Sequence, residues 1–199
     1  MPLYFHFRSP IRDFNGQLMC RKWRYVKADG HQCQKTMCID LPYCYIHNRI
    51  AFKLRVKPSR IPNAGVGLFV DDTEQPIGQV IYRKGDKICP YYGAMINEAE
   101  VDRRYDGSTA PYTLQVQKGL SMDGALQRGI GTLINHKSFQ QGANCVFGVD
   151  RQNNAFIKAY KDIRNGDELY CNYNPNPRGK RYIVNEEGVE YATNRNKYN

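Results

Sequence analysis

The chain has 199 residues, enough to bury the core of one ordinary domain and a small appendage but not two large domains. The first ten residues hold no uninterrupted apolar segment and no later apolar run approaches the length of a bilayer span, so we expect a soluble, intracellular protein without a membrane helix. The formal net charge of +10 is uneven, because residues 1–60 hold twelve Lys and Arg against three Asp and Glu. This basic part favours DNA or another polyanion as a partner, and a merely solvated basic face is the alternative.

Four of the seven cysteines lie within residues 1–50, together with three of the four histidines. Thiols stay free in a reducing compartment, so metal binding or simple burial explains these cysteines better than disulfides do. Three thiolates and one imidazole satisfy tetrahedral zinc, and a Cys-x-x-His pair has the right length to chelate one ion. The predicted ligands are Cys20, Cys33, Cys44 and His47, with Cys38 as an alternative to Cys20 or Cys33. We therefore predict a small zinc-binding module over residues 1–50, and unligated buried thiols are the competing interpretation.

Residues 51–174 carry short alternating or apolar runs bounded by turn signals, which predicts a mainly β domain. The expected strands include Phe52–Val56, Val80–Tyr82, Tyr112–Val116 and Ala155–Ala159. Tight turns are expected at Gly85-Asp86 and at Asn165-Gly166-Asp167, because Gly and Asn adopt positive φ at low cost.

One short helix is expected within this domain, and a polar tail after it. Asn97 has the properties of an N-cap, Glu100 would complete a capping box, and the helix continues towards Tyr105. The sequence Asn-Pro-Asn-Pro at residues 174–177 breaks regular structure, so residues 175–199 form a tail that folds only against the domain or a substrate. The three cysteines outside the N-terminal cluster, Cys89, Cys145 and Cys171, are expected to be small buried hydrophobic residues.

Four short motifs carry the chemistry when they are taken in order. They are Gly65-Val66-Gly67-Leu68-Phe69, Tyr91-Tyr92-Gly93, Leu133-Ile134-Asn135-His136 followed by Asn144-Cys145, and Gly166-Asp167-Glu168-Leu169 leading to Asn172-Tyr173. Each motif alone is weak, since an isolated Gly-x-Gly is more often a turn. Their order and spacing resemble the SET-domain family of protein-lysine methyltransferases, over a stretch from about Ile61 to Tyr173.

The resemblance implies a mainly β, pseudoknotted fold of the β-clip type, over residues 51–174, in which the Asn135-His136 and Leu169–Tyr173 segments lie side by side. It implies S-adenosylmethionine as the cofactor, approached by the backbone of Gly65, Val66 and Gly67 and bound by Asn135, His136 and Tyr173. It also implies that Tyr173 is the catalytic tyrosine and that Tyr91 is a wall of the lysine channel.

The residue types suit this reaction. Methyl transfer is an in-line displacement, so the protein must align donor and acceptor rather than supply covalent chemistry. The acceptor lysine must lose its proton first, and an apolar channel lined by Tyr91 and Tyr173 next to a positive sulfonium favours that loss. Either tyrosine taken alone can equally be an ordinary core aromatic residue.

Departures from the family pattern are also informative. Lys137-Ser138 replaces the common Ser-Cys, and no cysteine follows Cys171, so the zinc-binding, cysteine-rich tail that many members carry after the SET domain is missing. The chain is in this respect similar to the compact SET proteins of large DNA viruses. Another group must then close the lysine channel, and we expect Tyr182 or Tyr191 of the tail to do so. Cys171 stands where the family usually has Phe or Tyr, and its smaller side chain predicts room for higher methylation states.

The resulting hypothesis is a lysine methyltransferase that acts on histones first of all, placed in the nucleus or on chromatin, or in a viral factory if the source is viral. A SET enzyme for a non-histone protein is one alternative. The other is a catalytically silent SET fold that acts as a zinc-containing module for binding chromatin or nucleic acid.

Overall fold

A computed structural model describes residues 21–22, 30–31, 36–37, 45–105, 110–125, 129–173, 181–184 and 190–193. Strands dominate the described residues, which confirms the prediction of a mainly β protein. The strands are β1 (Arg21–Lys22), β2 (Thr36–Met37), β3 (Leu54–Pro58), β4 (Val66–Val70), β5 (Val80–Tyr82), β6 (Lys87–Tyr91), β7 (Ala94–Asn97), β8 (Thr113–Gln117), β9 (Leu120–Asp123), β10 (Asn135–His136), β11 (Cys145–Val149), β12 (Ala155–Ala159), β13 (Ile163–Arg164), β14 (Tyr170–Cys171), β15 (Arg181–Val184) and β16 (Glu190–Thr193). The helices are α1 (Tyr45–Phe52), α2 (Glu98–Tyr105) and a 3-10 turn, η1 (Ile130–Leu133).

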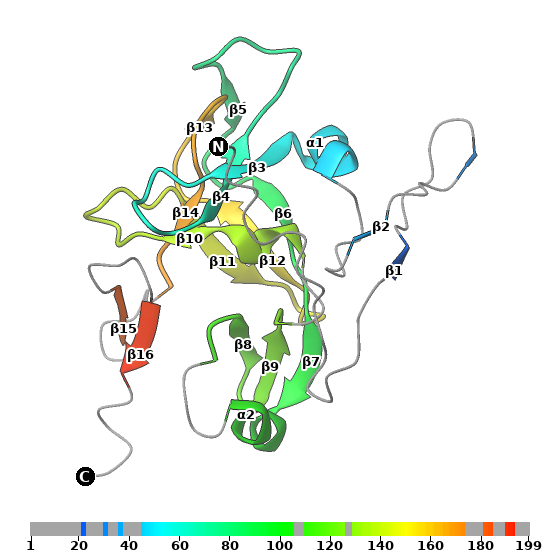
Figure 1. The fold of residues 1–199 in the computed structure, drawn as a ribbon, viewed down its shortest axis with the longest axis vertical. Coiled ribbons are helices and arrows are strands. Elements are labelled where there is room, and N and C mark those ends of the chain that lie inside the picture. The colour runs from blue at the N-terminus through cyan, green and yellow to red at the C-terminus, as the bar shows by residue number, and fades with distance from the viewer. Residues whose placement is uncertain are drawn as a thin grey trace.

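A five-stranded sheet with the order β10-β14-β11-β12-β6 forms the centre of the domain (Figure 1). Smaller sheets flank it: β3 pairs with β4, β5 with β13, and β7, β9 and β8 form an antiparallel set that carries α2. In the central sheet β14 inserts between β10 and β11 and runs parallel to both. The last strand of the domain thus completes a sheet whose neighbouring strands come earlier in the chain.

The core fills the space between the central sheet and the β3–β4 pair. Leu54, Leu68 and Val70 contribute from β3 and β4, and Ile157 and Leu169 from the later part of the chain, all with no exposed surface. The alternation of buried and exposed residues along β12 explains why that strand was predictable from its sequence. Burying such side chains stabilises a domain by roughly 1.5 to 3 kcal/mol each, so this cluster is the main source of stability.

The predicted helix is present, and one of the two hydrogen bonds of its predicted capping box is formed. Asn97 Oδ1 accepts a hydrogen bond from the backbone N–H of Glu100 at 2.9 Å, which confirms Asn97 as the N-cap. The Glu100 carboxylate does not reach back to complete a capping box, because it pairs with Arg103 and Arg104, each at 2.6 Å. Ion pairs one turn along the helix therefore outcompete the predicted box.

Helix α1 was not predicted, and it crosses the expected domain boundary at residue 50. It ends at Phe52, and Lys53 follows with a positive φ of 49°, which turns the chain into β3. The predicted strand over Phe52–Val56 therefore begins two residues later, at Leu54.

Most of the predicted zinc module lies outside the described residues, including Cys20, Cys33, Cys38 and Cys44. His47 is described and lies buried in α1. Within the described ranges, no three His, Cys, Asp or Glu side chains gather in a way that could hold a metal ion. The tail, for which we expected folding only against the domain or a substrate, contains the antiparallel pair β15–β16. Over the described part of the chain, no helix is long and apolar enough to span a membrane.

Candidate active site

The two segments predicted to be neighbours pair directly. Strand β10 runs parallel to β14, with Asn135 opposite Tyr170 and His136 opposite Cys171, and the Lys137 N–H donates to the Cys171 carbonyl at 3.1 Å. More than thirty residues separate the segments in sequence, so only the fold brings them together. The prediction that they lie side by side is confirmed.

Among the residues that the structure describes, β10 pairs on one side only, and its other side is open. Strand β10 is at the edge of the central sheet. Because the backbone of Lys137 points towards β14, the alternation along a strand turns the N–H and C=O of His136 away from the sheet. These two groups form a donor and acceptor pair suited to a planar ligand.

The glycine-containing segment joins the same site through Asn135. The Asn135 Nδ2 atom donates to the Val66 carbonyl at 2.9 Å, across a sequence separation of 69 residues. Gly65 has a positive φ of 68°, and no atom of the described residues lies within 4 Å of an added Cβ, so this turn is open towards them. Gly67 is different, because a Cβ there would lie 2.1 Å from Glu168 Oε1. Gly67 is therefore required first by contacts within the protein.

Glu168 is the buried carboxylate around which these segments assemble, and it was not among the predicted site residues. It is only 2% exposed. Its oxygens accept hydrogen bonds from Ser59 Oγ at 2.6 Å, from the Arg60 N–H at 2.7 Å and from the Tyr170 hydroxyl at 2.7 Å. Asn135 Nδ2 lies 3.5 Å from the same group. Glu168 thus ties the turn before Gly65 to β10 and β14.

Tyr173 closes the site next to His136. Its backbone N–H donates to His136 Nδ1 at 3.1 Å, and the two rings lie with centroids 5.2 Å apart. The Tyr173 hydroxyl donates to the Ile134 carbonyl. Both ends of this tyrosine are therefore held by the segment that also carries Asn135.

His136 is half-buried, and its charge state follows from that. Burial lowers the pKa of the imidazole below its ordinary value, against a smaller opposing contribution from the backbone of Cys171. Because Nδ1 accepts the Tyr173 N–H, the proton of the neutral ring is on Nε2. The ring therefore serves as a neutral support for Tyr173 rather than as a cation.

Tyr91 and Tyr173 are joined by an aromatic residue that sequence reasoning did not select. The Phe147 ring lies 5.5 Å from Tyr91, edge to face, and 5.8 Å from Tyr173. The Tyr91 hydroxyl donates to the Tyr112 carbonyl at 2.7 Å. The row Tyr91–Phe147–Tyr173 gives the site an apolar wall with a hydroxyl towards each end.

Cys171 belongs to the hydrophobic core, against which Phe147 and Tyr173 pack. It has no exposed surface and sits opposite Cys145 in the sheet. Burial, together with the neighbouring Cys145 thiol, raises the pKa of the Cys171 thiol, so the side chain stays neutral. Cys89 and Cys145 are likewise buried and free, as the sequence predicted.

The other two predicted channel residues, Tyr182 and Tyr191, lie on the β15–β16 hairpin. The register pairs Tyr182 with Ala192 and Ile183 with Tyr191. Paired residues share a face of an antiparallel ladder and successive residues alternate, so positions 182 and 191 fall on opposite faces. One face of the hairpin can therefore present only one of the two positions.

Comparison with known proteins agrees with this geometry. Residues 79–174 match the profile of the SET domain. This chain carries a SET domain. The matched region includes the Asn135-His136 and Tyr173 segments, and it begins after the Gly65 turn that the structure joins to it.

The alignments with individual relatives include much of this chain but only a small part of each relative. The histone-lysine N-methyltransferase mes-4 of Caenorhabditis elegans is 28% identical in an alignment 169 residues long, which covers 75% of this chain and 18% of that protein. A crystal structure of polycomb repressive complex 2 from Chaetomium thermophilum aligns with a TM-score of 0.50 at 23% identity, over 63% of this chain and 16% of that chain. The same complex bound to GSK126 gives the same values. These structural similarities show the SET-domain fold alone.

Proposed function

We propose that this SET-domain protein transfers methyl groups from S-adenosylmethionine to lysine side chains of a protein substrate, with histones as the first substrate class. One observation carries the proposal: the Gly65 turn, the Asn135-His136 strand and Tyr173 converge on one site although they are distant in sequence. The name of the C. elegans relative, a histone-lysine N-methyltransferase, supports the choice of histones.

The residues at this site fit the cofactor. Among the described residues no donor bonds to Asn135 Oδ1, so this oxygen can accept a hydrogen bond from an ammonium or amino group. The outward N–H and C=O of His136 can pair with the edge of an adenine ring, and the open side of Gly65 allows close approach of a ligand to the backbone. When bound, S-adenosylmethionine supplies an electrophilic methyl group on a positive sulfonium.

The aromatic wall defines what the chain contributes to the reaction. A lysine lying along Tyr91, Phe147 and Tyr173 loses hydration, and desolvation favours its neutral, nucleophilic form. Each tyrosine hydroxyl donates its own proton to a backbone carbonyl, so its oxygen can still accept an N–H from the lysine amine. The wall thereby orients the amine lone pair and excludes water, which is the positioning that an in-line displacement requires.

Two features govern the lysine channel in this proposal. The tail hairpin closes the channel through either Tyr182 or Tyr191. Cys171 leaves space for a lysine that already carries methyl groups, provided that the neighbouring core does not refill it.

The test is incubation with radiolabelled S-adenosylmethionine and a panel of core histones, nucleosomes and non-histone proteins. We expect label on lysine in at least one histone, and loss of label with Tyr173→Phe. Tyr160→Phe is the matched control, because Tyr160 is 46% exposed and packs on Phe139 at 4.6 Å, outside the site. Absence of cofactor binding by the parent protein would instead favour the silent binding module, and label only on non-histone proteins would change the substrate class.

We also propose that residues 1–50 bind one structural zinc ion through Cys20, Cys33, Cys44 and His47, with Cys38 as the alternative ligand. The donor set suits tetrahedral zinc, and burial of His47 in α1 would place the metal against the start of the SET domain. Elemental analysis of the purified protein should give about one zinc per chain. A content near zero, with no change in circular dichroism on chelation, would show that the cysteines are only buried thiols.

The proposed histone substrate implies where in the cell the protein acts. A protein that methylates histones acts where chromatin is, so we propose a nuclear or chromatin-associated enzyme. Localisation of a tagged protein to a compartment free of chromatin would contradict this.

A further inference from the structure

A strip of cations runs along α1 and β3, and none of its side chains is assigned to methyl transfer. We define the α1–β3 strip as Arg49, Arg55, Lys57 and Arg60. Arg55 and Lys57 are two residues apart on β3 and therefore lie on one face of the strand. Their side chains are 51% and 38% exposed, and that of Arg49 is 34% exposed. The strip is thus accessible over the described part of the chain.

A single carboxylate, that of Asp71, forms ion pairs with three of these four cations. Asp71 lies 2.7 Å from Arg49, 3.6 Å from Arg55 and 2.9 Å from Lys57. Burial works to raise the pKa of Asp71, but Lys57 and Arg49 outweigh that effect, so the pKa lies below its ordinary value and the carboxylate stays charged. Three positive charges against one negative charge leave the strip strongly positive.

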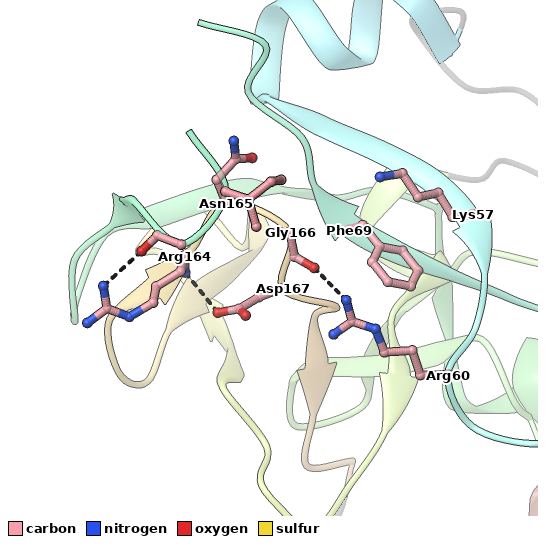
Figure 2. Close-up of a pocket in the computed structure, with 9 residues that line it drawn as sticks. Lys57, Arg60, Phe69, Arg164, Asn165, Gly166 and Asp167 are labelled. Carbon is pink, nitrogen blue, oxygen red and sulfur yellow. Dashed lines mark hydrogen bonds between the residues drawn. The ribbon is translucent and has the colours of Figure 1, made fainter. Parts of the chain in front are cut away.

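Arg60 extends the strip to a cavity of about 390 Å³ (Figure 2). Its guanidinium lies 5.2 Å from the Phe69 ring, on which Lys57 also lies at 5.6 Å, and it donates to the Gly166 carbonyl at 2.9 Å. No carboxylate of the described residues forms an ion pair with Arg60. The ring and the Gly166 carbonyl hold the guanidinium in place without neutralising it.

The opposite wall of the cavity adds a further cation and one acid. Arg164 donates through Nη1 to the Gly78 carbonyl at 2.9 Å, and its backbone N–H donates to the Asp167 carboxylate at 2.8 Å. Asp167 is the acidic side chain lining the cavity, against Lys57, Arg60 and Arg164. The balance of charge remains positive from α1 to the far wall.

We propose that the α1–β3 strip binds the phosphate backbone of duplex DNA, a role that goes beyond methyl transfer. A group of cations that outnumbers its carboxylate suits a polyanion, and planar guanidinium groups match phosphate oxygens. The net charge of +10, most of it within residues 1–60, would steer such a polymer to this end of the chain. No side chain of the strip is assigned to the cofactor or the substrate lysine, so DNA and substrate lysine can be held together. The strip adjoins that site through its backbone, since Lys57 pairs with Gly67 and the Arg60 N–H donates to Glu168.

The test uses the full chain and a labelled duplex of about 30 base pairs with mixed sequence, followed by fluorescence anisotropy as salt is varied. Losing one phosphate contact should weaken binding by up to about eightfold at about 0.1 M salt and lower the salt slope by about one. We expect this for Arg55→Gln and for Lys57→Gln. Asp71→Asn should do the opposite and tighten binding, because it removes the charge that neutralises the strip.

The matched control is Lys118→Gln, an exposed cation in the turn between β8 and β9, which lies at the other end of the domain (Figure 1). This variant should bind DNA as the parent does. Circular dichroism melting shows whether each variant folds. The anisotropy readout measures DNA binding alone, so it does not depend on methyl transfer. The proposal would be overturned if Lys118→Gln weakened DNA binding as much as the strip variants do, or if all variants bound DNA with the same affinity. It would also be overturned if polyglutamate displaced the labelled duplex from the protein as efficiently as unlabelled duplex does.

Discussion

The buried Glu168 carboxylate allows the most direct test of how the site is assembled. Glu168→Ala would leave the Arg60 N–H, the Ser59 hydroxyl and the Tyr170 hydroxyl without their acceptor. An unsatisfied buried donor costs about 1 to 3 kcal/mol, and loss of one partner in a buried network commonly costs about 3 to 5 kcal/mol in all. That is a large part of the roughly 5 to 15 kcal/mol that stabilises an ordinary domain.

Glu168→Gln separates the shape of this side chain from its charge. The amide oxygen can keep the Arg60 and Tyr170 hydrogen bonds, while the amide nitrogen takes the place of Oε1. There it can donate to the Ser59 hydroxyl, but it then faces the Nδ2 donor of Asn135 at about the present 3.5 Å. We expect a smaller loss of stability than for alanine and weaker cofactor binding, because Asn135 must move.

Urea denaturation followed by circular dichroism measures the first effect, and titration of S-adenosylmethionine into each variant measures the second. Glu74→Ala is the matched control, since Glu74 is exposed and should change the free energy of unfolding by no more than about 0.5 kcal/mol. Parent-like stability of Glu168→Ala would refute the role assigned to this carboxylate. Parent-like cofactor binding by a folded Glu168→Gln would show that it does not position Asn135.

Three further predictions concern the proposed catalytic and cofactor residues. Tyr173→Phe should slow single-turnover methyl transfer by roughly a hundred- to a thousandfold at saturating cofactor while leaving cofactor binding nearly unchanged, and a parent-like rate would make Tyr173 a packing residue. Asn135→Ala should weaken cofactor binding by direct titration, because it removes both the contact to Val66 and the Oδ1 acceptor; unchanged affinity would contradict the assignment. The depressed pKa of His136 means that the unfolded chain binds its proton more readily, so stability should be lost as pH falls below about 6.5, and His136→Gln should show a smaller loss between pH 7 and pH 5. Identical pH profiles of the urea midpoint would disprove this.

Sequence patterns anticipated the parts of the fold that depend on local physics. The strand Ala155–Ala159 and the turn glycines Gly85 and Gly166 were predicted where they occur, because side-chain alternation and positive φ are encoded by the residues themselves. Helix α1 was not predicted, since its sequence carries no acidic residue in the first turn and only a weak apolar face. The order and spacing of the motifs, through their resemblance to a known family, also made Tyr91, Asn135, His136 and Tyr173 candidate site residues.

The sequence by itself determined a mainly β SET domain, its motif order and an excess of positive charge before residue 60. Only the tertiary structure decided that Glu168 is buried among Ser59, Arg60 and Tyr170, because a carboxylate beside leucine looks the same in sequence whether solvated or paired. It also decided that the Phe147 ring packs between those of Tyr91 and Tyr173, and that Asp71 forms ion pairs with three cations. The physical reason is the same in each case: burial and partnership depend on contacts between distant segments, which the composition of any one segment does not record.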